Sequence, residues 1–399
     1  MHLNERPSLS TEQLAQVTNT LARWLPSSEG AAAVSGWGLA EWEAAEWVVY
    51  WQNALPWLVQ RIRKSGAVVP EPVRERLFEL DRESRERTKR MMAGCVALLK
   101  ALDGAGIEAI PFKGAALAPL YYPDPLLRPL ADLDILIHKK RLPQSLDILR
   151  QLGYRYYSRS AEDVVYLRGE RKANIWAADN VHPVELHYTL REEYAGIGYN
   201  LAEELWRSSW KRPFWDGFNA RIPNTPTLLH HVCAHATSDW LIQRGRLMHI
   251  DDIRKLCARM TDMDWGLFTT AVPPYGARFV YPALAFAARY SGRFIPDSVE
   301  TYLRQNCPEA LLAWIETTKL ADVSESNPTV RSGIGFDIAR LLARSRPDMA
   351  RFWLRSFFPR RWNLSKRYPR LVKTPFWPLA YVLINVDRMY HLARKRVSI

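Results

Sequence analysis

Residues 131–137 (ADLDILI) alternate polar and apolar side chains, and no other feature of the sequence restricts the possible folds as much. Successive side chains of a strand point to opposite faces, so the pattern predicts a strand with Asp132 and Asp134 on one face. Around it we expect a short strand at 107–112, a turn at Lys113-Gly114, and helices at 115–122 and 141–152. This alternation of strands and helices indicates an α/β (α+β) core with a small mixed sheet.

Helical regions are expected on both sides of this core. Three further strands are predicted at 155–157, 164–169 and 173–177, and a fourth at 181–190 (VHPVELHYTL). Before the core we expect a capping box at Ser10 and Gln13 and a helix pair within 39–62. We expect a helix at 83–103 at the start of the core, and helices at 228–242 and 247–260 after it. We therefore divide the chain into a helical region (1–84), the core (85–200), a helical domain packing on the core (201–335) and a basic, aromatic helical segment (336–399).

The paired aspartates favour a metal site. By strand rise, the Cα atoms of Asp132 and Asp134 lie roughly 6.5–7 Å apart. Carboxylates this close repel each other unless a cation lies between them, and oxygen ligands suit Mg²⁺ or Mn²⁺. Glu185, flanked by apolar residues, is expected to face the same sheet surface as a third carboxylate, and His187 shares that face. The alternative is a solvated polar strand face without a metal.

The turn upstream of the aspartates favours phosphate binding. Gly114 would let a phosphate approach the backbone closely, and the helix that begins there supplies free N–H groups and a favourable dipole. Lys113 adds a positive charge, and Arg128 could make a forked contact to a phosphate.

Residues 107–137 resemble a family of poorly characterised bacterial nucleotidyltransferases within the polymerase-β-like superfamily. That family has a Lys-Gly turn, a later Arg, an Asp-x-Asp strand and a carboxylate-x-His strand, and all four are present here. The resemblance covers about residues 85–260. The superfamily turn is usually Gly-Gly or Gly-Ser, whereas this chain has Lys-Gly-Ala, and the 17 residues between Gly114 and Asp132 form a longer spacing than is usual.

The resemblance implies a Mg²⁺-dependent transfer of a nucleotidyl group from a nucleoside triphosphate (NTP) to a hydroxyl of a small molecule, peptide or protein. In such a reaction Asp132, Asp134 and Glu185 would hold the metal ions, Glu185 could also accept the hydroxyl proton, and pyrophosphate would leave. The residues expected to bind the nucleotide are Lys113, Gly114, Arg128, His187 and His235. A tailoring step in peptide or polysaccharide biosynthesis would fit such a family. The alternatives are transfer to RNA, a related phosphate or sugar transfer from an activated nucleotide, and a non-catalytic nucleotide binder.

His231, His235 and Asp239 share one helix face, because they are spaced four residues apart. A metal site is conceivable there, but this spacing without a nearby general-base Glu is a weak signal, and the alternative is a polar helix face covering the sheet. The resemblance favours a His at position 235 in a helix near the active site. We expect Asp251 and Asp252, with Arg246, to make ion pairs or caps, although the resemblance also allows a substrate contact from Asp251.

The net charge of +13 is concentrated at one end of the chain. The last 60 residues hold 15 Lys and Arg against two Asp, so they carry the whole excess. Aromatic side chains lie among these charges, a mixture that binds single-stranded RNA or an anionic membrane surface. The competing interpretation is a helical subdomain that buries its aromatic side chains. The apolar run 375–386 is short for a membrane span and fits a buried or interfacial helix.

The first thirty residues lack an apolar block, so we expect no signal peptide, and no run of about 18 apolar residues predicts a spanning helix. The four cysteines are far apart and form no CxxC pair, which favours free buried thiols in a reducing compartment. These features predict a cytoplasmic protein, peripheral at the inner membrane face if the basic segment binds lipid.

Overall fold

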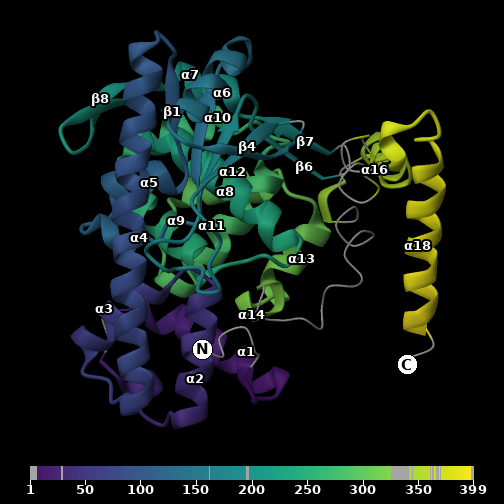
Figure 1. Cartoon of the computed structure of the whole chain (residues 1–399). Coiled ribbons are helices and arrows are strands. Elements are labelled where there is room, and N and C mark those ends of the chain that lie inside the picture. The colour runs from purple at the N-terminus through teal and green to yellow at the C-terminus, as the bar shows by residue number, and fades with distance from the viewer. Residues whose placement is uncertain are drawn as a thin grey trace. The chain divides into compact units, whose positions relative to one another are not determined.

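The computed structural model describes residues 7–27, 30–160, 162–194, 197–324, 341–343, 345–359, 361, 364, 368 and 370–396 (Figure 1). The chain divides into two compact units. The first comprises Met1–Glu192 and Asn200–Ile334, and the second comprises Glu193–Tyr199 and Gly335–Ile399. The four-part division made from the sequence stays a prediction.

Helices at the start of the first unit follow the predicted pattern. They are α1 (Thr11–Trp24), α2 (Leu39–Trp51), α3 (Leu55–Ser65) and α4 (Glu71–Gly104). The capping box of Ser10 and Gln13 begins α1, and the pair α2–α3 matches the helix pair expected within 39–62.

Helix α4 is longer than predicted, because the charged stretch before residue 83 is helical too. Val73, Leu77 and Leu80 are buried at helical spacing and continue the apolar stripe of the predicted part. Arg76 on this early part binds the buried Glu46 of α2, with Nε and Nη2 at 3.1 and 2.8 Å from Oε2. The stripe and this ion pair fix α4 against α2.

A five-stranded mixed sheet forms the centre and confirms the predicted fold class. Its strands are β1 (Ala109–Pro111), β2 (Leu133–Ile137), β3 (Arg155–Arg159), β4 (Asp163–Arg168) and β5 (His182–His187), in the order β1-β2-β5-β4-β3. Strands β2 and β5 are parallel, and the other neighbours are antiparallel. Helix α5 (Gly114–Tyr121) follows β1, and helix α6 (Leu142–Gln151) follows β2.

The strand predicted at 173–177 is wrong, because this segment forms turns that dock on α2. The indole Nε1 of Trp176 donates to the carbonyl of Tyr50 at 2.9 Å, and the backbone N–H of Ile175 donates to the Tyr50 hydroxyl at 2.9 Å. These bonds take the backbone away from the sheet.

A hairpin interrupts the region that we expected to be mainly helical after residue 201. Strands β8 (Ser209–Trp215) and β9 (Phe218–Pro223) pair antiparallel. Asp216 and Gly217 turn the chain with φ of 49° and 70°. Asp-Gly is a strong hairpin signal, because both central residues of a type I′ turn need positive φ.

The remaining elements are mostly helices, as predicted. Those of the first unit after the sheet are α7 (Ala202–Arg207), α8 (Thr225–Leu241), α9 (Leu247–Cys257), α10 (Asp262–Ala271), α11 (Ala277–Ser291), α12 (Asp297–Gln305), α13 (Glu309–Thr317) and α14 (Leu320–Val323). Strands β6 (Arg191–Tyr194) and β7 (Ile197–Asn200) form a separate pair. All four cysteines are buried free thiols, as expected.

Helices α16 (Arg346–Phe357) and α18 (Leu379–Arg396) belong to the second unit. Ala380 and Ile384 of α18 are buried in a small cluster with Leu364 and Val372. Within the described part of the chain, no helix has the length and apolar character needed to cross a membrane.

Candidate active site

The two parallel strands of the sheet bring the predicted carboxylates together. Asp134 on β2 lies directly opposite Glu185 on β5 in the strand register, and Asp132 comes just before β2. Asp132 and Asp134 both line a cavity of about 90 Å³ that is open to solvent. The full lining is Asn53, Lys113, Gly114, Leu117, Arg128, Pro129, Ala131, Asp132, Asp134, Val232, His235, Arg246, Met248, His249 and Asp252.

Lys113 lies at the turn between β1 and α5 and reaches Asp134. Its backbone has φ of 46° and ψ of −131°, a conformation that glycine adopts far more readily. The ammonium Nζ lies 2.9 Å from Oδ1 of Asp134. Burial alone would lower the pKa of Lys113, but Asp134 and Asp132 raise it well above the usual lysine value. The site therefore holds a fixed positive charge at the start of α5, on a residue in a strained conformation.

His187 and Asp134 form a second buried contact. Nε2 of His187 lies 2.9 Å from Oδ1 of Asp134 and 3.5 Å from Oε2 of Glu185. Burial would lower the pKa of His187, but its hydrogen bonds to Asp134 and Glu185 raise the pKa to about 9. Burial would raise the pKa of Asp134, but Lys113 and His187 hold it far below the usual range. Asp134 is therefore an ionised carboxylate held between two cations.

The pKa of Asp132 is raised, whereas that of Asp134 is lowered. Burial and the nearby charges of Asp134 and Glu185 raise the pKa of Asp132 to about 6, and Lys113 and Arg246 offset this only in part. The raised pKa means that burial and the two neighbouring carboxylates together disfavour the charged form of Asp132. A further cation would offset this effect.

Gly114 makes room for Arg128, which packs against the start of α5. A Cβ at position 114 would lie 2.2 Å from Nη1 of Arg128 and 2.8 Å from Leu130. The guanidinium is held by Asp252 of α9, with Nε and Nη2 each 2.8 Å from a carboxylate oxygen. Tyr122 donates its hydroxyl to the same carboxylate at 2.8 Å. Arg128 thus lies at the cavity wall as half of a forked, buried ion pair, and its contact to a phosphate stays a prediction.

Arg87 of α4 binds the backbone just before β2 and β5, a role that the sequence did not reveal. Its guanidinium donates to the carbonyls of Ala131, Asn180 and Val181 at 3.3, 3.2 and 2.9 Å. Burial lowers the pKa of Arg87 to about 10, and Asp132 raises it. Since these carbonyls lie just before β2 and β5, Arg87 helps set the position of Asp132.

Other lining residues come from distant parts of the chain. Asn53, in the turn between α2 and α3, has a φ of 58°, and Arg246, His249 and Asp252 come from the start of α9 or just before it. We expected Asp252 to make an ion pair, which is confirmed, but no local pattern indicated its partner, 124 residues away. Asp251 pairs with Arg254, with Oδ1 3.2 Å from Nε, and is not among the residues lining the cavity.

The histidines of α8 separate into two environments. His231 is buried against Phe112, with ring centroids 5.2 Å apart, and burial lowers its pKa to about 3. His235 lies at the cavity wall, with Nδ1 3.5 Å from Glu192 and Nε2 3.6 Å from Asp239. Of the three residues on the predicted helix face, His231 thus belongs to the core and the other two face a polar environment.

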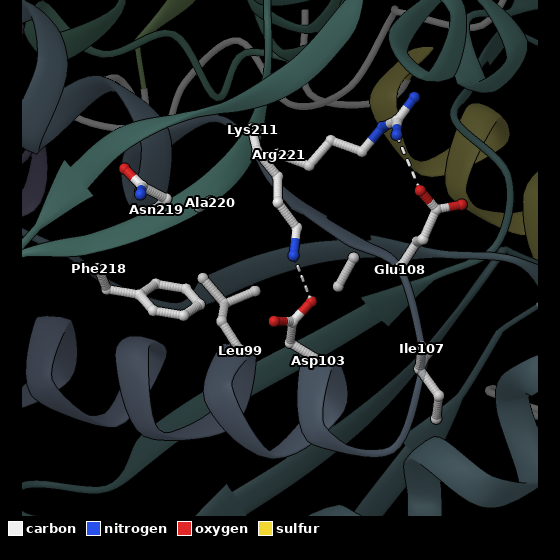
Figure 2. A pocket seen from close by; sticks show the side chains of 10 residues that line it. Leu99, Asp103, Ile107, Glu108, Lys211, Phe218, Asn219, Ala220 and Arg221 are labelled. Carbon is white, nitrogen blue, oxygen red and sulfur yellow. Dashed lines mark hydrogen bonds and ion pairs between the residues drawn. The ribbon is translucent and has the colours of Figure 1, made fainter.

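A second hollow lies between the end of α4 and the β8–β9 hairpin (Figure 2). Its charged residues are paired with one another: Lys211 Nζ lies 2.7 Å from Asp103 Oδ1, and Arg221 Nη1 lies 2.8 Å from Glu108 Oε1. The hollow therefore has no excess charge among these four residues to attract a ligand.

A family model described as an uncharacterised nucleotidyltransferase matches residues 39–292, and the chain belongs to this family. The match begins at α2, so it includes the turn that carries Asn53 as well as the sheet and helices α8 and α9. The family is one of transferases. No curated protein matches the chain.

Two solved structures are similar to parts of the chain. The antibiotic-resistance factor ANT(2'')-Ia, solved in solution, is 15% identical, covers 46% of this chain and 91% of its own, and has a TM-score of 0.33. An antigenic nucleotidyltransferase-like protein from Paracoccidioides brasiliensis is 15% identical, covers 55% of this chain and 94% of its own, and has a TM-score of 0.33.

Proposed function

We propose that the cavity binds an NTP with Mg²⁺ or Mn²⁺, and that the protein transfers the nucleotidyl group to a hydroxyl of a small-molecule, peptide or protein acceptor. One observation carries this proposal: Asp132, Asp134 and Lys113 line the same cavity. Lys113 lies at the start of helix α5, and Asp134 lies opposite Glu185 in the strand register. A tailoring step in peptide or polysaccharide biosynthesis is the pathway that we propose.

The donor set fits a divalent cation. Asp132, Asp134 and Glu185 offer oxygen ligands, which Mg²⁺ and Mn²⁺ prefer. The raised pKa of Asp132 agrees with the fit, because it reflects burial together with two neighbouring carboxylates, Asp134 and Glu185. Ligand atoms of Asp134 and Glu185 lie within 4.8 Å of each other, close enough to share one ion. Bound metal ions would neutralise charge on the triphosphate and on the leaving pyrophosphate.

The phosphates would lie at the turn before α5. The first N–H groups of a helix lack intrahelical acceptors and attract anions. Lys113 adds a charge at this point, and Arg128 and His235 would contact the nucleotide from the cavity wall. His187 would hold Asp134 in position. Gly114 keeps the helix start open to Arg128.

Glu185 would accept the proton of the acceptor hydroxyl. The hydroxyl oxygen would then attack the α-phosphorus, the bond from the α-phosphorus to the bridging oxygen would break, and pyrophosphate would leave with that oxygen. The Glu185 side chain is 29% exposed, so an acceptor can reach it from solvent. Positioning and charge neutralisation contribute most of the rate in such reactions.

Calorimetric binding of ATP, GTP, CTP and UTP with Mg²⁺ tests the proposal. We expect one nucleotide to bind in a metal-dependent way, and we expect the double variant Asp132→Ala, Asp134→Ala to lose this binding. A matched control replaces two exposed aspartates, Asp147→Ala and Asp179→Ala, and should bind like the wild type. Failure of all four nucleotides to bind, or unchanged binding in the cavity variant, would refute the proposal.

Three alternatives give different results in the same assays. Transfer to RNA predicts an RNA affinity that falls steeply with salt, because phosphate contacts release counterions. A related phosphate or sugar transfer predicts binding of an activated nucleotide in preference to a free triphosphate. A non-catalytic binder predicts metal-dependent nucleotide binding without turnover by any acceptor.

For the C-terminal unit we propose an anionic membrane surface as the partner, so that a cytoplasmic protein would lie at the inner membrane face. Leu379, Val382, Leu383 and Val386 of α18 are each about half exposed, and their spacing places them on one helix face. Phe376, just before the helix, is 67% exposed. An exposed apolar stripe within a strongly basic segment is the pattern of an interfacial helix.

Sedimentation with lipid vesicles tests this partner. The full chain should bind vesicles that contain phosphatidylglycerol and not neutral phosphatidylcholine vesicles, and Val382→Asp with Leu383→Asp should abolish binding. Met263→Asp, at an exposed apolar residue of α10, is the matched control and should bind normally. Binding to RNA alone, or to neither, would overturn the membrane proposal.

A further inference from the structure

His235 and His249 line the cavity, and Asp239 lies next to both of them, in a cluster that shares no residue with the carboxylate site. His235 and Asp239 come from α8, and His249 comes from α9. Nε2 of His235 and Nε2 of His249 each lie 3.6 Å from the same oxygen, Oδ2 of Asp239. The ligand atoms of all three residues lie within 4.8 Å of one another.

These separations suit ligands of one ion better than hydrogen bonds. A distance of 3.6 Å is too long for a hydrogen bond between an imidazole nitrogen and a carboxylate oxygen. Two ligands at roughly 2.1 Å from a tetrahedral ion lie about 3.4 Å apart, which is close to the observed spacing. A small contraction around an ion would therefore satisfy all three groups at once.

The surroundings of His235 support the same interpretation. The other nitrogen of His235, Nδ1, lies 3.5 Å from Oε1 of Glu192. Metal-binding histidines are commonly held in this way, with a carboxylate on the nitrogen that does not contact the metal. His249 is 9% exposed, and its Nδ1 has no hydrogen-bond partner among the described residues. Nε2 of His249 faces Asp239, while its ring lies beside the rings of His235 and Trp240.

We infer that His235, Asp239 and His249 form a site for one transition-metal ion of the zinc class, separate from the Mg²⁺ site that we propose at Asp132 and Asp134. Two imidazoles and one carboxylate are a ligand set typical of Zn²⁺, whereas Mg²⁺ prefers oxygen ligands. Glu192 orients His235 from outside the site. The inference does not depend on nucleotidyl transfer.

The ion would take part in binding a ligand in the cavity. Zn²⁺ sites with three protein ligands keep a fourth position for water or substrate. His235 and His249 line the same cavity as Lys113 and Asp132. An oxygen donor in this cavity, such as a phosphate, can therefore complete the coordination. The contact to the nucleotide that we assign to His235 would then pass through the ion.

Metal-free full-length protein titrated with Co²⁺ tests the inference, because tetrahedral Co²⁺ gives intense visible absorption bands. We expect one Co²⁺ per chain with such bands, displaced by one equivalent of Zn²⁺. The variants His249→Ala and Asp239→Asn should weaken binding by roughly 100-fold or more, and Glu192→Gln by roughly 10-fold. Asp239→Asn keeps the size of the side chain, so it separates lost coordination from misfolding; circular dichroism checks the fold of each variant.

Two controls separate this site from the others. The double variant Asp132→Asn, Asp134→Asn should lose Mg²⁺-dependent nucleotide binding and keep the Co²⁺ bands. His138→Ala, at a half-exposed histidine outside the cluster, should bind Co²⁺ normally. Wild type without Co²⁺ bands, bands that survive in both His249→Ala and Asp239→Asn, or strong near-ultraviolet bands from thiolate ligands would overturn the inference and leave the nucleotide proposal untouched.

Discussion

The cavity and the hollow of Figure 2 are lined by the same kinds of charged side chain, yet the ion pairs differ in their exposure to solvent. In the hollow, Lys211 and Asp103 are 62% and 51% exposed and can exchange their ion pair for water. In the cavity, Arg128 and Asp252 are 12% and 3% exposed. Both pairs are close, but only the second is removed from solvent.

Exposure decides what an ion pair contributes to the protein. An exposed pair contributes little to stability and leaves the local field weak. A buried pair holds its charges in fixed positions, and loss of one partner leaves the other charge uncompensated. The cavity thus contains charges held in fixed positions, whereas the charges of the hollow are paired with each other and exposed to solvent.

The largest effect that tests this contrast is expected at the buried pair. Asp252→Ala should lower the free energy of unfolding by about 3–5 kcal/mol, because it leaves the guanidinium of Arg128 buried and unpaired. Urea denaturation of the metal-free protein measures the change. A loss below about 1 kcal/mol would place Arg128 and Asp252 in the same class as surface pairs.

A smaller effect is expected at the glycine beside this pair. Gly114→Ala should lower the free energy of unfolding by about 1–3 kcal/mol, since the added Cβ meets Nη1 of Arg128 and Leu130. Gly104→Ala, at the end of α4 where a Cβ meets nothing within 4 Å, is the control and should change stability by less than about 1 kcal/mol. Equal effects of the two changes would mean that the wall of the cavity yields to a methyl group.

The charge of His187 should appear in the pH dependence of the metal-free protein. Its folded pKa of about 9 exceeds the value of about 6.5 in an unfolded chain, so the stabilisation is complete below pH 6.5 and is lost as pH rises through 9. Between these pH values the free energy of unfolding should fall by up to about 1.4 kcal/mol per pH unit, the slope for one proton. His187→Gln should remove this part of the slope. His138→Gln should keep the wild-type slope. An unchanged slope in His187→Gln would contradict a protonated His187 between Asp134 and Glu185.

The smallest effect is expected in the hollow. Lys211→Ala should change the free energy of unfolding by less than about 1 kcal/mol, because both members of its pair with Asp103 are solvated. Added salt should erase even this difference, since salt screens exposed charges. A loss comparable to that of Asp252→Ala would show that exposure does not separate the two regions.

Local sequence periodicity predicted the central part of the site. Alternation along 131–137 and 181–190 fixes which side chains share a sheet face, and the parallel pairing of β2 with β5 then brings Asp134 beside Glu185. The Lys-Gly turn predicted the start of α5, because a glycine after an apolar strand ends the strand and opens a helix. Such features depend on neighbours within a few residues, so a single sequence can reveal them. The catalytic roles of these residues stay predictions.

Contacts between residues far apart in the chain could not be predicted, because they do not depend on neighbouring residues. The contact between Arg128 and Asp252 joins residues 124 positions apart, and His249 meets His235 and Asp239 only after α9 packs on α8. Trp176 diverts the segment 173–177 toward α2 although its residues suit a strand. The β8–β9 hairpin differs, because its turn residues Asp216 and Gly217 are a local hairpin signal within a region that we predicted to be helical.

Helix α4 determines how short a fragment can be made that still contains the whole cavity. Its 34 residues span about 50 Å, from the helices α2 and α3 to the sheet (Figure 1). A fragment beginning at residue 85 would cut this rod and remove Arg76, which anchors it to Glu46. It would also discard Asn53 from the cavity. The N-terminal helices are therefore part of the smallest piece that we expect to fold with a complete pocket, and limited proteolysis should spare the region between α2 and the sheet.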